Sequence, residues 1–298
     1  MTRIDFGRCP AAATTRFAPS PTGHLHLGHI VNAVFVWGIA RLLGGRVLLR
    51  IEDVDRLRSR EEYERSILDD LEWLGLAWDG EPERQSDRTA IYEAALASLR
   101  QAYHVYACTC SRKDIALVTP AGPDEEARYP GTCRLEGLEP GKGRGTRLEL
   151  PDDVIAFHDT LLGRQSQQPS GQCGDLLVRD RLGQWTYQFA VTVDDWLQGV
   201  NLVIRGQDLL PSTGRQILLA RMLGRPEPAQ FLHHPLVVDA RGRKLSKRDQ
   251  SMGIRELRAA GWTPERVLGE AARLAGLVER ETTIAAGDLA GLFQRLNV

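Results

Sequence analysis

The chain has 298 residues, of which 42% are hydrophobic, enough to bury one large α/β core and to carry a smaller insertion. Its 38 basic and 39 acidic residues nearly cancel, which excludes a nucleic-acid binder that depends on a large positive net charge but permits local basic faces. The sequence has no apolar run near the roughly 20 residues that cross a bilayer and no signal peptide at residues 1–5, so we expect a cytoplasmic protein without a membrane partner.

The first part of the sequence has the pattern of a βαβ unit. Residues 14–19 predict a short buried strand, residues 28–43 an apolar helix that ends at a glycine pair, and residues 46–51 a second core strand. Together these elements predict an α/β fold with a Rossmann-like parallel sheet. Folds of this class bind ligands at the turn that follows the first strand.

Two helices are expected next. Residues Ser59–Glu62 match a capping box and predict a helix that runs to about residue 74, and Asp87 is expected to cap a second helix that ends near Tyr103. We therefore expect residues 1–105 to form the first half of the Rossmann domain.

The composition changes in the segment that follows, where Gly, Pro and charged residues are frequent. Short strand-like pieces occur at residues 146–150, 155–159 and 176–179. We expect residues 106–183 to form an inserted, mostly β subdomain.

Regular patterns resume after the insertion. A strand at residues 201–205 and a helix at residues 212–223 are expected to complete the parallel sheet, so that residues 184–240 form the second half of the Rossmann domain. Residues 241–298 are expected to form a basic loop and a helical segment, in which Thr263-Pro264-Glu265 marks the clearest helix start.

A motif with two histidines lies between the first strand and its helix. His26 and His29 are three residues apart, and Gly28 allows a close approach of the backbone. At a helix N-terminus two imidazoles can donate hydrogen bonds to an anionic group. By itself the pair equally fits two metal ligands or two solvated histidines.

A basic cluster, Arg243–Arg248, follows the apolar stretch Leu236–Val238. Lysines on a flexible loop, here Lys244 and Lys247, can close over a triphosphate and neutralise the charge that develops as the α-phosphate is attacked. An isolated cluster of this kind is equally typical of a basic surface loop or of a nonspecific nucleic-acid patch.

Taken together, the two motifs resemble the signatures of the class I aminoacyl-tRNA synthetases. The HIGH signature matches His26-Leu27-Gly28-His29, and the KMSKS signature matches Lys244-Leu245-Ser246-Lys247-Arg248, in the same order and fold context. Further segments are similar to the glutamyl branch of this family: residues 16–23, 49–55, 193–195 and 204–209, together with Tyr187. The resemblance spans nearly the whole chain and is weakest in the insertion.

The resemblance implies a pocket for L-glutamate. A ligand with two carboxylates and an ammonium needs at least one fixed guanidinium, a counter-anion and a hydroxyl. Arg16, helped by Tyr187 and Arg205, would bind the side-chain carboxylate, and Glu52 would hold the ammonium. The same pocket would include Phe17, Ala18, Pro19 and Ser20. Without the resemblance, Glu52 and Arg205 also fit surface ion pairs, and Tyr187 a core aromatic residue.

The resemblance also implies that the chain is a ligase that uses ATP with Mg²⁺. The ATP-binding residues would be His26, Gly28, His29 and Lys247, and the catalytic residues His26, His29, Lys244 and Lys247. The α-carboxylate of glutamate would attack the α-phosphate in line and release pyrophosphate, so the enzyme would act through positioning and charge stabilisation.

Three cysteines cluster in the insertion. Cys108, Cys110 and Cys133, with Tyr129, offer three thiolates and a phenol, and zinc favours four such ligands in a tetrahedron. The residues also fit three free cysteines, or a site in which Cys173 or His158 is the fourth ligand. The resemblance implies the set Cys108, Cys110, Tyr129 and Cys133, because the glutamyl branch uses the pattern CxC…YxxxC to bind Zn²⁺.

The segment after Arg248 is expected to hold a small helical junction but not the anticodon-binding domain of a full glutamyl-tRNA synthetase. This points to the truncated paralogues, the glutamyl-queuosine tRNA(Asp) synthetases, and implies transfer of glutamate to queuosine in the anticodon loop of tRNA(Asp). Three alternatives stay open: a glutamyl- or glutaminyl-tRNA synthetase module that charges a tRNA 3′ end, a nonenzymatic tRNA-binding regulatory module, and a ligase with a non-RNA acceptor. We expect a monomer.

Overall fold

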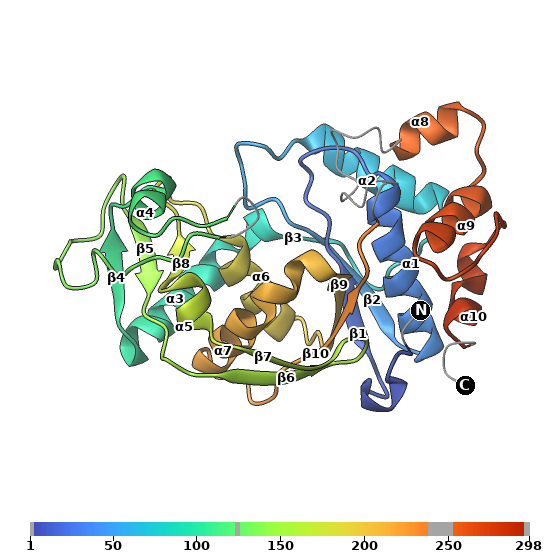
Figure 1. The fold of residues 1–298 in the computed structure, drawn as a ribbon. Helices are drawn as coiled ribbons and strands as arrows, with labels where there is room; N and C mark the ends of the chain where they lie inside the picture. Colours follow the sequence, from blue (N-terminus) through green and yellow to red (C-terminus); the bar gives the residue numbers. More distant parts are fainter. Residues whose placement is uncertain (1–2, 123–125, 238–252, 295–298) are drawn as a thin grey trace.

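The computed structural model describes residues 3–122, 126–237 and 253–294. Its N-terminal part is the expected βαβ unit, in which α1 (Leu27–Leu42) connects the parallel strands β1 (Thr14–Phe17) and β2 (Arg46–Ile51) (Figure 1). The turn after α1 requires glycine, because Gly44 has a φ of +61° and a Cβ atom on Gly45 would lie 2.3 Å from the Ala13 carbonyl oxygen. A two-residue strand, β3 (Glu83–Arg84), pairs in parallel with β2.

A second sheet has the strand order β7-β6-β10-β9. Its strands are β6 (Ile155–Asp159), β7 (Gly163–Gln167), β9 (Leu202–Gly206) and β10 (Gln230–His234). β10 runs parallel to both β9 and β6, whereas β7 is antiparallel to β6. Asn201 joins the two sheets, because its N–H donates to the Thr14 carbonyl oxygen at 3.0 Å and its side-chain oxygen accepts from the Thr14 N–H at 2.8 Å. The carboxyl ends of β1, β2, β9 and β10 therefore lie along one edge, as the predicted parallel sheet requires.

A third, antiparallel sheet lies at the end of the molecule drawn at the left of Figure 1. It consists of β4 (Val105–Cys108), β5 (Gly145–Leu148) and β8 (Leu176–Arg179), with the short helices α4 (Arg112–Val118) and α5 (Pro169–Cys173) beside it. This division differs from the expected insertion of residues 106–183, because β6 and β7 belong to the sheet of β9 and β10, so that the insertion consists of the sheet β4-β5-β8 with its connecting segments. Short strands do not specify their partners locally, so their sheet is decided by pairing with distant residues.

The helices that surround the sheets include α2 (Glu61–Trp73), α3 (Thr89–Ala102) and α7 (Thr213–Met222), which are close to the predicted ranges. A further helix, α6 (Tyr187–Leu197), is not among the predicted elements. The predicted caps of α2 and α3 are wrong, because Arg60 and Arg88 occupy the N-cap positions and neither makes a side-chain capping bond. Ser59 is held in the preceding turn by a bond from its N–H to the Asp55 carbonyl oxygen, and Asp87 lies in the 3₁₀ turn Gln85–Arg88.

Within residues 253–294, the C-terminal part contains three α-helices: α8 (Ile254–Ala259), α9 (Pro264–Leu274) and α10 (Leu289–Gln294). The predicted start of α9 is confirmed, because the Thr263 hydroxyl accepts a hydrogen bond from the Arg266 N–H at 3.3 Å. α10 packs against α1 so closely that a Cβ atom on Gly38 would lie 2.3 Å from the Phe293 ring. Within the described ranges, no helix is long and apolar enough to cross a membrane.

Candidate active site

The two histidines of the N-terminal motif form a reciprocal cap at the start of α1. The Gly28 N–H donates to His26 Nδ1 at 3.1 Å, and the His26 N–H donates to His29 Nδ1 at 3.1 Å. The two rings lie against each other, with centroids 3.8 Å apart. Because each Nδ1 accepts a hydrogen bond, the proton of a neutral ring lies on Nε2, so both rings carry an N–H group at a helix N-terminus. This arrangement suits an anionic group.

A cavity of about 330 Å³ lies between the start of α1 and the carboxyl ends of β9 and β10. It is lined by His26, Gly28, His29, Val31, Asn32, Gly206, Asp208, His234, Leu236 and Val237. The Asn32 amide contacts His234 Nε2 at 3.1 Å, and the His234 ring stacks on Phe35 at a centroid distance of 4.7 Å. Burial lowers the pKa of His234 to about 4, so this ring is neutral near pH 7.

The second sequence motif, with Lys244 and Lys247, lies outside the described residues, but both segments that flank it adjoin this cavity. On one side, Val237 lines the cavity. On the other, Gly253 forms a β-bridge with His26, and the Ile254 N–H donates to the Leu25 carbonyl oxygen at 3.0 Å. The described residues on either side of the motif, Val237 and Gly253, therefore both lie near His26.

A buried ionic cluster lies at the carboxyl ends of β1 and β2. Arg16, which is 4% exposed, donates from Nε to Asp195 Oδ1 at 3.0 Å. Arg50, fully buried, donates to the same Asp195 oxygen at 2.8 Å and to Glu52 Oε1 at 3.0 Å. Burial alone would raise the pKa of Asp195, but the two guanidinium groups hold it below its ordinary value. At Glu52 the effect of burial is larger than that of Arg50 and Arg16, and its pKa is raised.

Arg205, at the end of β9, lies close to this cluster but has a different set of partners. Its guanidinium donates to four neutral acceptors: His233 Nε2 at 3.0 Å, Gln216 Oε1 at 2.7 Å, Thr213 Oγ1 at 2.9 Å and the Leu209 carbonyl oxygen at 3.4 Å. Among the described residues, none supplies a carboxylate within ion-pair distance of Arg205. Burial and the positive charge of Arg16 lower the pKa of Arg205, an effect that nearby Tyr187 and Asp195 oppose.

The other predicted pocket residues are placed as follows. Tyr187, the first residue of α6, has its pKa raised by burial and by Glu52, against the opposing effect of Arg205 and Arg16. Tyr187 is therefore close enough to Glu52, Arg205 and Arg16 to feel their charges. Phe17 does not share that position, because its ring packs on Trp37 in the core at a centroid distance of 5.3 Å. The turn after β1 continues through Ala18, buried Pro19 and exposed Ser20, and the Pro19 carbonyl oxygen accepts from the Glu52 N–H at 3.0 Å.

The family model described as tRNA synthetases class I (E and Q), catalytic domain, matches residues 12–288. The chain belongs to this family of class I tRNA synthetases. This synthetase is 44% identical to a protein of Symbiobacterium thermophilum named glutamyl-Q tRNA(Asp) synthetase, over 93% of the chain and 91% of that protein. It is 45% identical to a protein of the same name from Cupriavidus metallidurans, over 91% of the chain and 87% of that protein.

A solved structure of a glutamate tRNA ligase from Elizabethkingia meningosepticum, in complex with its amino acid, has the same fold. The TM-score is 0.77 at 27% identity, and the match covers 96% of the synthetase but 65% of that chain. The synthetase thus spans slightly less than two thirds of this relative. The comparisons confirm the predicted class I fold, the ligase family and the resemblance to the glutamyl-queuosine branch.

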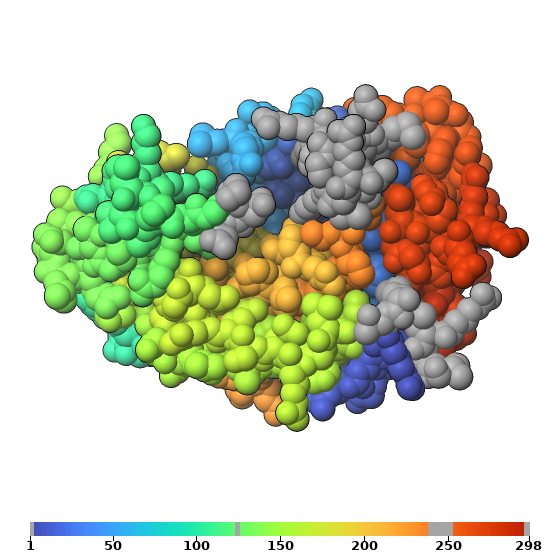
Figure 2. All heavy atoms as spheres, in the orientation of Figure 1, coloured from blue at the N-terminus to red at the C-terminus, as the bar shows by residue number. Residues whose placement is uncertain are grey.

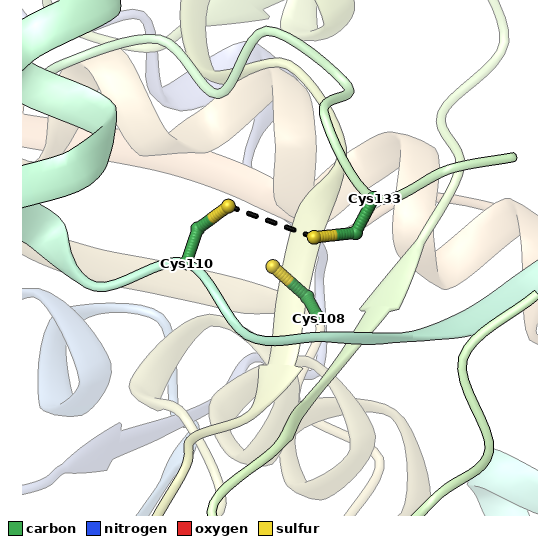
Figure 3. Close-up of side chains that lie close together, drawn as sticks. All are labelled: Cys108, Cys110 and Cys133. Atoms are coloured by element: carbon green, nitrogen blue, oxygen red, sulfur yellow. Dashed lines mark hydrogen bonds between the residues drawn. The ribbon is translucent and has the colours of Figure 1, made fainter. Parts of the chain in front are cut away.

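The insertion of the synthetase holds three thiols that point toward one another (Figure 3). The sulfur atoms of Cys108, Cys110 and Cys133 all lie within 4.8 Å of one another, and the Tyr129 hydroxyl is 3.5 Å from Cys108 Sγ. Zn–S bonds of about 2.3 Å put tetrahedral sulfur ligands about 3.8 Å apart, so the spacing suits a metal ion. Hydrogen bonds from Thr109 and its neighbours overcome the effect of burial and lower the pKa of the Cys133 thiol to about 7.

Cys173 and His158, the alternative fourth ligands, lie outside the cluster. Cys173 Sγ donates to the Pro169 carbonyl oxygen at 3.3 Å, and His158 lies on β6, opposite Arg164 of β7. A buried cation does adjoin the thiols, because Arg147 donates from Nε to Cys108 Sγ at 3.3 Å and stacks over the Tyr129 ring at 3.6 Å. A positive charge in this position favours the thiolate form that binds metals.

The sequence predicts no individual role for Arg50 and Asp195, although both lie in segments that resemble the glutamyl branch. The sequence does contain a sign that these two residues are important. Arg50 is a charged residue in the strand Arg46–Ile51, and Asp195 is a charged residue in the amphipathic helix α6. Charged residues at buried positions of regular elements are paired in folded proteins. Which residues pair with them depends on how β1, β2 and α6 pack, so the cluster itself could not be read from the sequence.

Proposed function

We propose that this protein activates L-glutamate with ATP and Mg²⁺ and transfers it to the queuosine base of tRNA(Asp). The observation that carries the activation step is Arg205, a buried guanidinium with only neutral hydrogen-bond partners among the described residues, beside Arg16, Glu52 and Tyr187. A buried positive charge without an ion-pair partner is stabilised by an anionic ligand. A substrate carboxylate supplies that charge.

The rest of the cluster supports glutamate as the amino acid. Arg16 and Arg50 share Asp195, and Glu52 retains one carboxylate oxygen beyond the one that Arg50 contacts. We assign Arg205 and Arg16 to substrate carboxylate groups and Glu52 to the ammonium. Glutamine fits less well, because a neutral amide leaves buried charge uncompensated.

The nucleotide is assigned to the cavity at the start of α1. His26 and His29 line this cavity at the N-terminus of α1, and both flanks of the segment with Lys244 and Lys247 adjoin it. The glutamate α-carboxylate attacks the α-phosphate, the bond to the pyrophosphate oxygen breaks, and glutamyl adenylate forms. The histidines and Lys247 stabilise the charge that develops on the phosphate oxygens.

The acceptor is proposed from the relatives named glutamyl-Q tRNA(Asp) synthetase, which the chain matches over about nine tenths of their length. On the face drawn in Figure 2, the surface of the protein is hollowed below the light blue segment that follows β2. RNA loops are recognised by splaying out single bases, and such an opening suits a base that enters from a loop.

A single labelling experiment tests both steps. The protein is incubated with ATP, Mg²⁺, labelled glutamate and tRNA from queuosine-competent cells, and nuclease fragments are mapped. We expect the label on the anticodon-loop fragment of tRNA(Asp), with an unmodified tRNA(Asp) transcript unlabelled. Label on the 3′ terminal adenosine would contradict the acceptor assignment, and the absence of glutamate-dependent pyrophosphate exchange would contradict the activation step.

We further propose that Cys108, Cys110, Tyr129 and Cys133 bind one Zn²⁺ ion that stabilises the insertion. Closed sites of this composition contribute directly to the folding free energy of small segments. We expect purified protein to hold about one zinc per chain, and Cys110→Ser to lower both the zinc content and the melting temperature.

The matched control for this prediction is Cys9→Ser, which alters a cysteine outside the cluster. It should retain the metal. Zinc content is measured by elemental analysis and melting by circular dichroism, and a metal-free wild-type protein with unchanged stability would refute the zinc assignment.

A further inference from the structure

Arg205 is held by the imidazole of His233. His233 lies on β10 and is fully buried, with its Nε2 atom 3.0 Å from Arg205 Nε and 3.1 Å from Thr213 Oγ1. A guanidinium N–H can only donate a hydrogen bond. His233 Nε2 must therefore be an acceptor without a proton.

The other ring nitrogen faces a carboxylate of fixed orientation. His233 Nδ1 lies 2.7 Å from Asp159 Oδ2, and both residues are fully buried. The second oxygen, Oδ1, accepts from the Leu161 and Leu162 N–H groups at 3.0 and 2.9 Å, and Oδ2 also accepts from the His233 N–H at 3.1 Å. These backbone donors fix Asp159 as an acceptor, so the proton of His233 lies on Nδ1.

Arg16 and Arg205, two arginines of the proposed amino-acid pocket, are thus held by different kinds of partner. Arg16 is bound directly by the carboxylate of Asp195, whereas Arg205 meets an uncharged ring with a carboxylate one step further away. Burial and the charge of Arg205 lower the pKa of His233, against the opposing effect of Asp159. Protonation would also turn Nε2 into a donor that faces the donor of Arg205.

We infer that Asp159 and His233 are positioning residues for amino-acid recognition, which hold the Arg205 guanidinium through an uncharged acceptor and leave its charge to a substrate carboxylate. The inference rests on the proposed function for the identity of that substrate. A direct carboxylate partner would compensate the charge of Arg205 and weaken its attraction for the ligand. The imidazole fixes the orientation of Arg205 without that compensation.

The test compares His233→Leu with His233→Gln in glutamate-dependent pyrophosphate exchange. Leucine removes the acceptor and should raise the KM for glutamate about ten- to hundredfold, the usual size for a lost bond to a charged group, with the KM for ATP nearly unchanged. Glutamine keeps a neutral acceptor oxygen and should restore most of the loss. His158→Leu, a histidine beside Asp159 on β6, is the control and should have the wild-type KM for glutamate.

Two further tests, a substitution of Asp159 and a spectroscopic measurement, remain possible even if His233→Leu does not fold. Asp159→Asn places an amide N–H toward Nδ1 and should raise the KM for glutamate, but much less when His233 is already Gln. In the wild-type protein, ¹⁵N shifts of labelled imidazoles, assigned with His233→Gln, should show His233 in the neutral Nδ1–H form.

An Nε2–H or doubly protonated His233 in the wild type, or an unchanged glutamate KM in a folded His233→Leu protein, would overturn the inference. If the protein does not activate glutamate at all, the result is different: the wild type itself would then show no glutamate-dependent pyrophosphate exchange. The tautomer of His233 would still be measurable in that case.

Discussion

Replacing Arg205 with Met is expected to raise the KM for glutamate in pyrophosphate exchange about 10²- to 10³-fold. Removing one member of a desolvated charge pair costs about 2–5 kcal/mol, because the remaining charge stays buried without its partner. In this pocket the remaining charge would be a substrate carboxylate. Glutamine carries one carboxylate fewer than glutamate, so the weak pyrophosphate exchange expected with glutamine should change less. The preference of the enzyme for glutamate over glutamine should therefore become smaller.

The matched control for this substitution is Arg215→Met. Arg215 is also buried, at 5% exposure, and also lies near the start of α7, but it pairs with Glu126 instead of facing the pocket. The control should keep the wild-type KM for glutamate even if it lowers the melting temperature. An Arg205→Met protein that is folded and keeps the wild-type KM would remove Arg205 from the substrate site.

Replacing Lys247 with Ala is expected to lower the rate of glutamyl-adenylate formation about 10²- to 10³-fold, the usual cost of losing one group that stabilises transition-state charge. The KM for glutamate should change little, because the amino-acid pocket is built from other residues. The prediction rests on the flanks of segment 238–252, which adjoin the cavity that His26 and His29 line.

Lys142→Ala provides the comparison for this second substitution, because Lys142 is an exposed lysine in the insertion. Single-turnover formation of pyrophosphate from ATP separates the chemical step from glutamate binding. A wild-type rate in the Lys247→Ala protein would exclude this lysine from the mechanism, and an equal loss in Lys142→Ala would mark the effect as nonspecific.

Local patterns in the sequence determined the elements that have a strong period or a clear end signal. The apolar run of α1 with its glycine stop, the strand β2 and the Thr263-Pro264 start of α9 could all be predicted, because each depends on neighbours within a few residues. The motif of His26 and His29 and the cysteine pattern of the insertion carried enough chemistry to suggest a nucleotide site and a metal site. The same local reasoning misplaced the caps of α2 and α3, since tight turns compete with helices for Ser and Asp.

Only the tertiary structure determined which charged and polar side chains of the pocket pair with one another. The partners in the pocket are far apart in the chain: Arg16 binds Asp195, Arg50 also binds Asp195, and Arg205 binds His233, which in turn binds Asp159. Buried polar groups must find partners, but the pairing follows from the order and register of β1, β2, β6, β9 and β10, which no short stretch of sequence specifies. The sequence by itself therefore determined that arginines and carboxylates line a site, and packing determined that Arg205 is the guanidinium held by a neutral ring.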